Sequence, residues 1–65
     1  MLTVVIPARD EQAAITETIE QIRTALTSAN IIHEILVIDD GSIDETGELA
    51  RAAGATVVRH PTSGG

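Results

Sequence analysis

The stretch ILVIDDGS, residues 35–42, runs from four apolar residues straight into two adjacent carboxylates and a glycine. Four large aliphatic side chains in a row predict a short strand that is buried on both faces. Asp39 and Asp40 repel each other, and a chain that needed only a turn could use Asn-Gly without that repulsion. The two adjacent charges therefore indicate that these carboxylates have a role other than forming a turn.

The segment before this strand predicts another strand and a helix. Residues 2–6 form a second apolar, β-branched run, which predicts a strand closed by Pro7. Between the two strands, apolar residues recur at helical spacing and predict a helix over residues 11–29. The members of that apolar stripe are Ile15, Ile19, Ile22 and Leu26.

The segment after the two aspartates predicts a second helix and a third strand. Ser42 and Glu45 match a capping box, so we expect Ser42 to cap this helix. The helix should run to about Ala53, with Gly54 in the left-handed position that follows it. Residues 55–59 predict a shorter strand, and residues 60–65 predict a loop. The order β-α-β-α-β predicts an α/β fold with parallel strands joined by right-handed crossovers.

The composition allows one small domain with an aliphatic core. The 65 residues include no aromatic residue and no cysteine, so neither ring side chains nor disulfides stabilise the fold. A chain of this size buries only about 60% of the surface that its unfolded form exposes. We therefore expect residues 1–65 to be a single partial domain, the N-terminal segment of a larger domain. The alternative is a homo-oligomer that associates through an exposed sheet edge.

The net charge of −6 and the hydropathy pattern exclude several partners. Nucleic-acid binding depends on basic groups that displace counterions, so we expect no nucleic acid as a partner. No apolar run approaches the roughly 20 residues that span a bilayer, so we expect no membrane segment in this chain. The start of the chain lacks a charged region followed by a long apolar one, which predicts a cytoplasmic protein.

Polar and charged residues follow all three predicted strands. Residues 7–11 follow the first strand, residues 39–42 follow the second, and His60 follows the third. Ligands of open parallel sheets bind at the carboxyl ends of the strands. We therefore expect the first two groups to lie within a side chain's reach of each other. His33, at the start of the second strand, is expected to have no functional role.

Several of these residues also have purely structural interpretations. Pro7 can simply end a strand, because it lacks an N–H group. Asp10 and Glu11 can be first-turn acids that favour the helix dipole. Arg9 can neutralise one of the paired carboxylates, or it can lay its guanidinium plane on a flat ring. The residues alone leave these alternatives open.

The aspartate pair is harder to explain structurally. One of the two can accept backbone N–H groups at the turn, as aspartate commonly does. The other needs a different donor, which the ring N–H of a nucleobase would supply. The two carboxylates could instead hold a hard cation. The two histidines are too far apart in sequence to form a spaced ligand pair.

Three segments together resemble the opening of glycosyltransferase family 2 enzymes. They are VVIPARDE at residues 4–11, EILVIDDGSIDET at residues 34–46 and GATVVRHPTSGG at residues 54–65. Within that family the chain is most similar to the polyprenyl-phosphate (dolichol-phosphate) mannosyl- and glucosyltransferase branch. The resemblance covers the whole chain.

The resemblance implies the N-terminal part of a GT-A fold, a Rossmann-like unit that binds a nucleotide. Such enzymes transfer a sugar from a nucleotide diphosphate, a GDP- or UDP-sugar, to an acceptor with the help of Mg²⁺ or Mn²⁺. In this branch the acceptor is a polyprenyl phosphate, and the parent protein is expected at the cytoplasmic face of a membrane. By the same resemblance Asp40 faces the base and Asp39 holds the loop. The residues implied to bind the nucleoside are Pro7, Arg9, Glu11, Ile38 and Asp40.

Two departures from the family pattern bear on this expectation. Arg9 and Asp10 stand where many members carry an aromatic residue and asparagine, so Arg9 would have to replace an aromatic ring against the base. The family's metal-binding Asp-x-Asp is expected beyond Gly65. We therefore assign no catalytic and no metal-binding residue to this chain, and we expect the 65-residue chain alone to transfer no sugar.

Three other interpretations compete with this resemblance. ILVIDDG also looks like the acidic strand end of a response-regulator receiver, but there the paired acids follow the first strand rather than the second. A dinucleotide-dependent oxidoreductase would carry G-x-G-x-x-G after the first strand, which this chain lacks. A non-catalytic β-α-β unit that self-associates is compatible with the residues as well.

Overall fold

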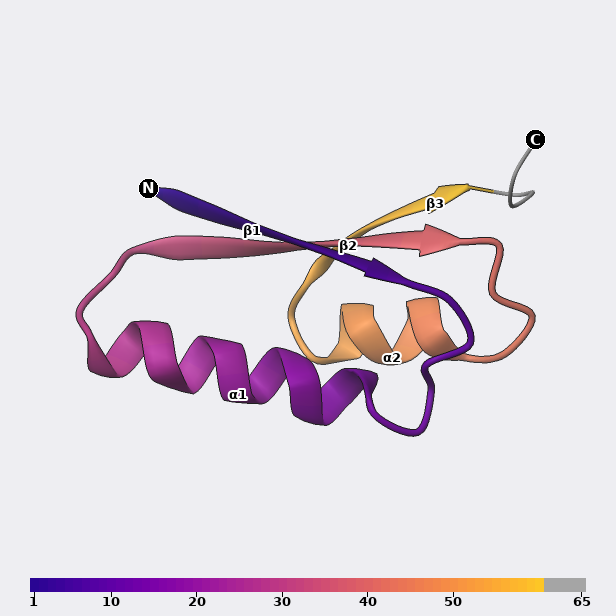
Figure 1. Ribbon diagram of the computed structural model, residues 1–65, viewed down its shortest axis with the longest axis horizontal. Helices are drawn as coiled ribbons and strands as arrows, with labels where there is room; N and C mark the ends of the chain where they lie inside the picture. The colour runs from indigo at the N-terminus through magenta and orange to yellow at the C-terminus, as the bar shows by residue number, and fades with distance from the viewer. Residues whose placement is uncertain (61–65) are drawn as a thin grey trace.

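The structure, a computed structural model that describes residues 1–60, contains a three-stranded parallel sheet with both helices on one face (Figure 1). The elements alternate along the chain as the sequence predicts, and the α/β class is confirmed. The loop expected over residues 60–65 falls almost entirely on residues 61–65, which lie outside the described residues. The elements are β1 (Leu2–Ala8), α1 (Ile15–Ser28), β2 (His33–Asp40), α2 (Thr46–Ala52) and β3 (Thr56–His60).

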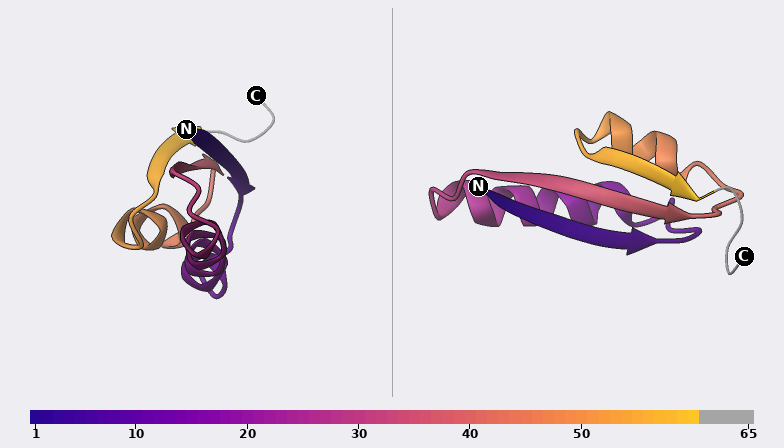
Figure 2. Two further views of the ribbon diagram at one scale, coloured as in Figure 1. Left: turned by 90° about the vertical axis from the view of Figure 1, so that its left-hand side faces the viewer. Right: turned by 90° about the horizontal axis from the view of Figure 1, so that it is seen from above.

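The sheet has the order β1-β2-β3, and both pairs of neighbours are parallel. Each new strand is added on the same side of the previous one, so right-handed crossovers place α1 and α2 on the same face of the sheet. The end view in Figure 2 shows both helices below the strands. Because the three strands are parallel, their carboxyl ends all lie at one edge of the sheet.

The core lies between β2 and the two helices. The side chains of Ile19 and Val37 are completely buried there, one from α1 and one from the central strand. Alternate residues of β2 are buried, because successive side chains of a strand point to opposite faces. The buried apolar residues are Ala8, Ile15, Ile19, Ile35, Val37, Ala50 and Ala55.

Both long strands extend further than predicted. β1 continues through Pro7 to Ala8, so Pro7 does not end the strand. A proline is tolerated in this strand because β1 lies at an edge of the sheet, where an N–H group is not needed on the outer side. β2 includes both aspartates instead of stopping before them. The carboxylates are therefore part of the sheet and not of a free loop.

The starts of both helices differ from the predictions. α1 begins at Ile15, not at residue 11, because Ala14 has a φ of −126°, which is outside the helical region. The carbonyl oxygen of Glu11 accepts from the N–H groups of Ala14 and Ile15, which forms a turn ahead of the helix. α2 begins at Thr46, so the predicted capping box at Ser42 is wrong. The end of α2 is as predicted, with Gly54 at a φ of 96°.

The second face of the sheet carries no helix within residues 1–60. Val5 and Val58 point to this face and are 55% and 43% exposed. None of the helices described here has the length and the apolar character that crossing a membrane requires.

We expect Ile19→Ala to destabilise the protein far more than Ile32→Ala. Ile19 is completely buried, whereas Ile32 is 78% exposed. Truncating a buried isoleucine costs about 2–5 kcal/mol, and an exposed one costs at most about 0.5 kcal/mol. Urea denaturation followed by circular dichroism measures both free energies of unfolding. Equal losses in the two variants would contradict the packing described here.

Candidate functional site

A hollow of about 210 Å³ opens at the carboxyl edge of the sheet, between the ends of β1 and β2. Figure 1 shows the two strands ending on the same side of the molecule, each followed by a loop. The hollow is lined by residues from both strand ends. They are Pro7, Ala8, Arg9, Glu11 and Asp40, so the structure brings together four of the five residues that the sequence predicts for nucleoside binding.

The fifth predicted residue, Ile38, lies next to the hollow in the sheet. It is in register with Pro7 of β1, and register partners in parallel strands point to the same face. Asp40 lies two residues further along β2 and shares that face. The alternation also explains why Ile38 and Asp40 are half-buried, whereas Val37 and Asp39 are buried under the helices.

The two adjacent carboxylates are separated by the sheet itself. Asp39 is 1% exposed and lies on the helix side, where its Oδ1 accepts a hydrogen bond from the N–H of Ser42 at 3.0 Å. Asp40 lies on the opposite face, with its side chain 45% exposed. The prediction that Asp39 holds the loop is thereby confirmed, and the carboxylate of Asp40 is left at the hollow.

Each carboxylate of the pair also has a basic residue beside it on β3. Arg59 is in register with Asp39, and its Nε lies 3.9 Å from Oδ2 of that residue. His60 is in register with Asp40, and its Nδ1 lies 3.8 Å from Oδ1. Within residues 1–60, Arg59 of β3 forms an ion pair with Asp39, and the ring of His60 lies beside Asp40, with which it forms an ion pair only when it is protonated. Of the two alternatives left open for Arg9, the pairing with one of these aspartates is not found among residues 1–60.

Arg59 also holds the loop that follows β2. Its Nη2 donates to the carbonyl oxygen of Ser42 at 2.9 Å, and its Nη1 lies 4.0 Å from a carboxylate oxygen of Glu48. The Oδ2 of Asp39 has no hydrogen-bond partner among the described residues. The guanidinium of Arg59 is therefore the charge that compensates this buried oxygen.

The loop after β1 is bound to the loop after β2 by a set of hydrogen bonds that we call the clasp. Three successive backbone N–H groups of the first loop donate to side chains of the second loop and of Thr46, the first residue of α2. The N–H of Asp10 donates to Oγ of Ser42 at 2.9 Å, and the N–H of Glu11 donates to Oγ1 of Thr46 at 2.8 Å. The N–H of Gln12 donates to Oδ2 of Asp44 at 3.3 Å.

Two further bonds of the clasp run in the opposite direction. The N–H of Ile43 donates to Oδ1 of Asp10 at 3.0 Å. The N–H of Glu45 donates to Oε1 of Gln12 at 3.2 Å. The clasp therefore supplies hydrogen-bond partners for backbone N–H groups of both loops, which would otherwise have to bond to water.

The clasp assigns roles that differ from those predicted. Ser42 is buried as an acceptor for the first loop and does not cap α2. Asp10 and Glu11 precede α1 by several residues, so they are not first-turn acids of that helix. Sequence reasoning missed Asp44 and Thr46 altogether. The signal that could have revealed them is the spacing of Ser42, Asp44 and Thr46, three short acceptor side chains at every second position.

A divalent cation does not fit the residues described here. Within residues 1–60 no group of three or more histidine, cysteine, aspartate or glutamate side chains is arranged to hold a metal ion. The paired carboxylates point to opposite faces of β2, so they cannot chelate one cation together.

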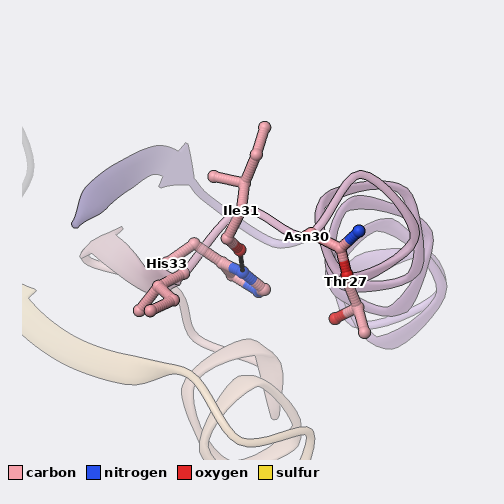
Figure 3. A pocket seen from close by; sticks show the side chains of 5 residues that line it. Thr27, Asn30, Ile31 and His33 are labelled. Carbon is pink, nitrogen blue, oxygen red and sulfur yellow. Dashed lines mark hydrogen bonds between the residues drawn. The ribbon is translucent and has the colours of Figure 1, made fainter.

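A larger hollow, of about 440 Å³, lies at the opposite end of the sheet (Figure 3). It is formed by the end of α1 and the start of β2, and its residues include Thr27, Asn30 and His33. Nδ1 of His33 lies 2.9 Å from the carbonyl oxygen of Ile31, so this ring is already engaged. The amino ends of parallel strands do not bind the ligands of such sheets, and we therefore place the functional site at the smaller hollow.

Comparison with known proteins identifies a family over nearly the whole chain. Residues 3–65 match the family described as Glycosyl transferase family 2. The chain is 40% identical over 57 residues to 4,4'-diaponeurosporenoate glycosyltransferase of Staphylococcus aureus strains USA300 and NCTC 8325. This match covers 88% of the chain but only 14% of each relative.

A solved structure shares the same arrangement of strands and helices. It is the crystal structure of mannosyl-3-phosphoglycerate synthase from Rubrobacter xylanophilus, with a TM-score of 0.82 and 30% sequence identity. The match covers 91% of this chain and 19% of that protein. The chain therefore corresponds to a small part of each protein to which it is similar.

The carboxylate of Asp44 should make the stability of the protein depend on pH. The Thr46 hydroxyl, which donates to Asp44, holds the pKa of this carboxyl below its ordinary value of 3.8, and the N–H groups of Thr46 and Gln12 act in the same direction against desolvation. A carboxyl with a lowered pKa in the folded state stabilises it above the unfolded pKa of about 3.9. This stabilisation is lost as the pH falls through the folded pKa.

We therefore expect Asp44→Asn to lower the free energy of unfolding at pH 7, and the difference from wild type to shrink below about pH 4. Urea denaturation at pH 7 and pH 3 measures this difference. Glu45→Gln removes the same charge from an exposed neighbour and serves as the control. A difference between Asp44→Asn and wild type that stays constant over this range would contradict the role of the carboxylate.

Gly47→Ala should destabilise the protein although the residue lies in a helix. A Cβ atom at this position would lie 2.9 Å from Oδ2 of the buried Asp39. Replacing a helical glycine by alanine normally stabilises by about 0.5–1 kcal/mol, whereas overpacking costs about 1–3 kcal/mol. Thermal unfolding would show a lower Tm for Gly47→Ala, and Ala52→Gly in the same helix supplies the local scale. A raised Tm would show that Asp39 moves away freely.

Proposed function

The chain belongs to glycosyltransferase family 2, and on this premise we propose that the hollow beside Asp40 receives the nucleoside of a nucleotide-diphosphate sugar. The observation that carries the proposal is the convergence of Pro7, Arg9, Glu11 and Asp40 around one hollow at the carboxyl edge of a parallel sheet. Family membership excludes the receiver and the dinucleotide-dependent oxidoreductase.

Asp40 is proposed to recognise the base. An ionised carboxylate only accepts hydrogen bonds, so it selects a ring that presents an N–H group, as uracil and guanine do. The sheet holds Asp40 by its backbone at the end of β2, and its side chain is 45% exposed with the His60 ring beside one of its two oxygens. This combination of a rigid backbone and an accessible acceptor suits the recognition of one edge of a ring.

Arg9 and Glu11 are proposed to bind the remaining parts of the nucleoside. Arg9 lines the hollow and has no ion pair with the two aspartates within residues 1–60. Its planar guanidinium can therefore stack on the base, in place of the aromatic ring that many family members carry. Glu11 offers a carboxylate at the same hollow for the hydroxyl groups of the ribose. Pro7, which lines the hollow, and Ile38, its register partner beside the hollow, are proposed to make apolar contacts with the nucleoside.

The activity of the whole protein is proposed from the family. It would transfer a sugar from a GDP- or UDP-sugar to an acceptor, with polyprenyl phosphate as the proposed acceptor and with Mg²⁺ or Mn²⁺ bound mainly by residues that this chain does not contain. The similar proteins are named for 4,4'-diaponeurosporenoate and for mannosyl-3-phosphoglycerate, so their names support no common acceptor. Nucleoside recognition is the part of this activity that residues 1–60 support.

Calorimetric titration with UDP and with GDP, with and without MnCl₂, tests the nucleoside site. We expect one of the two nucleotides to bind, and Asp40→Asn to weaken its binding about 10-fold or more, because hydrogen bonds to a charged group contribute about 1.5–3 kcal/mol. Glu20→Gln on the exposed surface of α1 makes the same change in net charge and should leave the Kd unchanged. No binding of either nucleotide by the wild type, or equal binding by Asp40→Asn, would overturn the proposal.

A further inference from the structure

We propose that Thr46 is a positioning residue for the nucleoside site, although it lies outside the hollow. This inference rests on the proposed function and assigns a role to the clasp beneath it. The side chain of Thr46 is completely buried, and its Oγ1 accepts the N–H of Glu11 at 2.8 Å. Through this bond the first residue of α2 holds one of the residues that line the hollow.

The hydroxyl of Thr46 has two partners, and this combination requires a group that both accepts and donates. Oγ1 accepts from Glu11 and donates to Oδ1 of Asp44. The same carboxylate oxygen also accepts the N–H of Thr46 at 3.0 Å. A carboxylate at position 46 could accept but not donate, and an apolar side chain could do neither.

Thr46 is also the stiffest member of the clasp. Its β-branched side chain has few χ1 rotamers in a helix, and its backbone belongs to α2. The other side chains of the clasp extend from loop residues or, like Gln12, have more rotatable bonds. Thr46 therefore transmits the position of the helix directly to the backbone of the first loop.

The backbone of the first loop needs such a fixed point. Asp10 has a φ of 51°, a conformation that residues other than glycine adopt at a cost. Arg9 and Glu11 flank Asp10, so the directions of their side chains depend on keeping that conformation. Asp40 belongs to β2 and does not depend on it. Loss of the Thr46 hydroxyl should therefore displace Arg9 and Glu11 relative to Asp40, which changes the shape of the hollow.

Thr46→Val and Thr46→Ser separate the hydroxyl from the size of the side chain. Valine has nearly the same shape without the hydroxyl, and serine keeps the hydroxyl without the methyl group. We expect Thr46→Val to shift the amide proton resonance of Glu11 upfield in ¹H–¹⁵N spectra, because this N–H loses its acceptor. We also expect the variant to bind the nucleotide about 10-fold more weakly, which is the effect of losing about one hydrogen bond. Thr46→Ser should keep the Glu11 resonance and most of the affinity.

A measurement on the wild type keeps the inference testable if Thr46→Val does not fold. A ligand that prefers the state with an intact clasp increases the population of that state. Saturation with UDP or GDP, whichever binds, should therefore slow hydrogen exchange at the amides of residues 10–12. Exchange rates that are the same with and without the nucleotide would overturn the inference.

The outcomes distinguish a failure of this inference from a failure of the proposed function. If the wild type binds neither nucleotide, the proposed function is overturned, and the inference with it. If the wild type binds and Thr46→Val binds equally well despite a shifted Glu11 resonance, only the inference is overturned. A purely structural role would lower the Tm of Thr46→Val and leave its Kd for the nucleotide unchanged, which also overturns the inference.

Discussion

Backbone N–H groups of residues 10–12 donate to the side chains of Ser42, Thr46 and Asp44, and these hydrogen bonds hold together the two loops at the carboxyl edge of the sheet. Each hydrogen bond of this kind contributes about 0.5–1.5 kcal/mol to the free energy of unfolding. The five bonds of the clasp are therefore important in a protein whose core is small and purely aliphatic. They also allow Asp10 to stay at a positive φ.

The sheet explains how the chain accommodates two adjacent carboxylates. Because successive side chains of a strand point to opposite faces, Asp39 is buried under the helices and Asp40 reaches the other face. The buried carboxylate is compensated by the N–H of Ser42 and by Arg59. The partly exposed one remains at the hollow. The sheet itself therefore lies between the two carboxylates, which reduces the repulsion between them.

Local patterns of the sequence were sufficient to predict the architecture. The apolar runs predict the three strands, and the spacing of Ile15, Ile19 and Ile22 predicts α1. The short connections between the elements then predict that β1 and β2 are parallel. Parallel strands bring residues 7–11 and Asp40 together at one edge of the sheet. These predictions succeed because strand and helix periodicity depend on neighbouring residues, and because parallel strands place their carboxyl ends at the same edge.

The sequence by itself therefore determined the order of the elements, the edge at which the polar residues gather, and that one of the two aspartates accepts a backbone N–H group of the turn. Only the tertiary structure decided that Ser42 and Thr46 serve the loop after β1, and that Arg59 rather than Arg9 pairs with Asp39. Each of these contacts joins residues from different elements. A hydroxyl or guanidinium group can bond to any segment that folding brings close, so its partner cannot be predicted from neighbouring residues. Both helices also begin later than predicted, at Ile15 and Thr46, because residues 10–12 and 42–45 form the contacts between the two loops instead of helical turns.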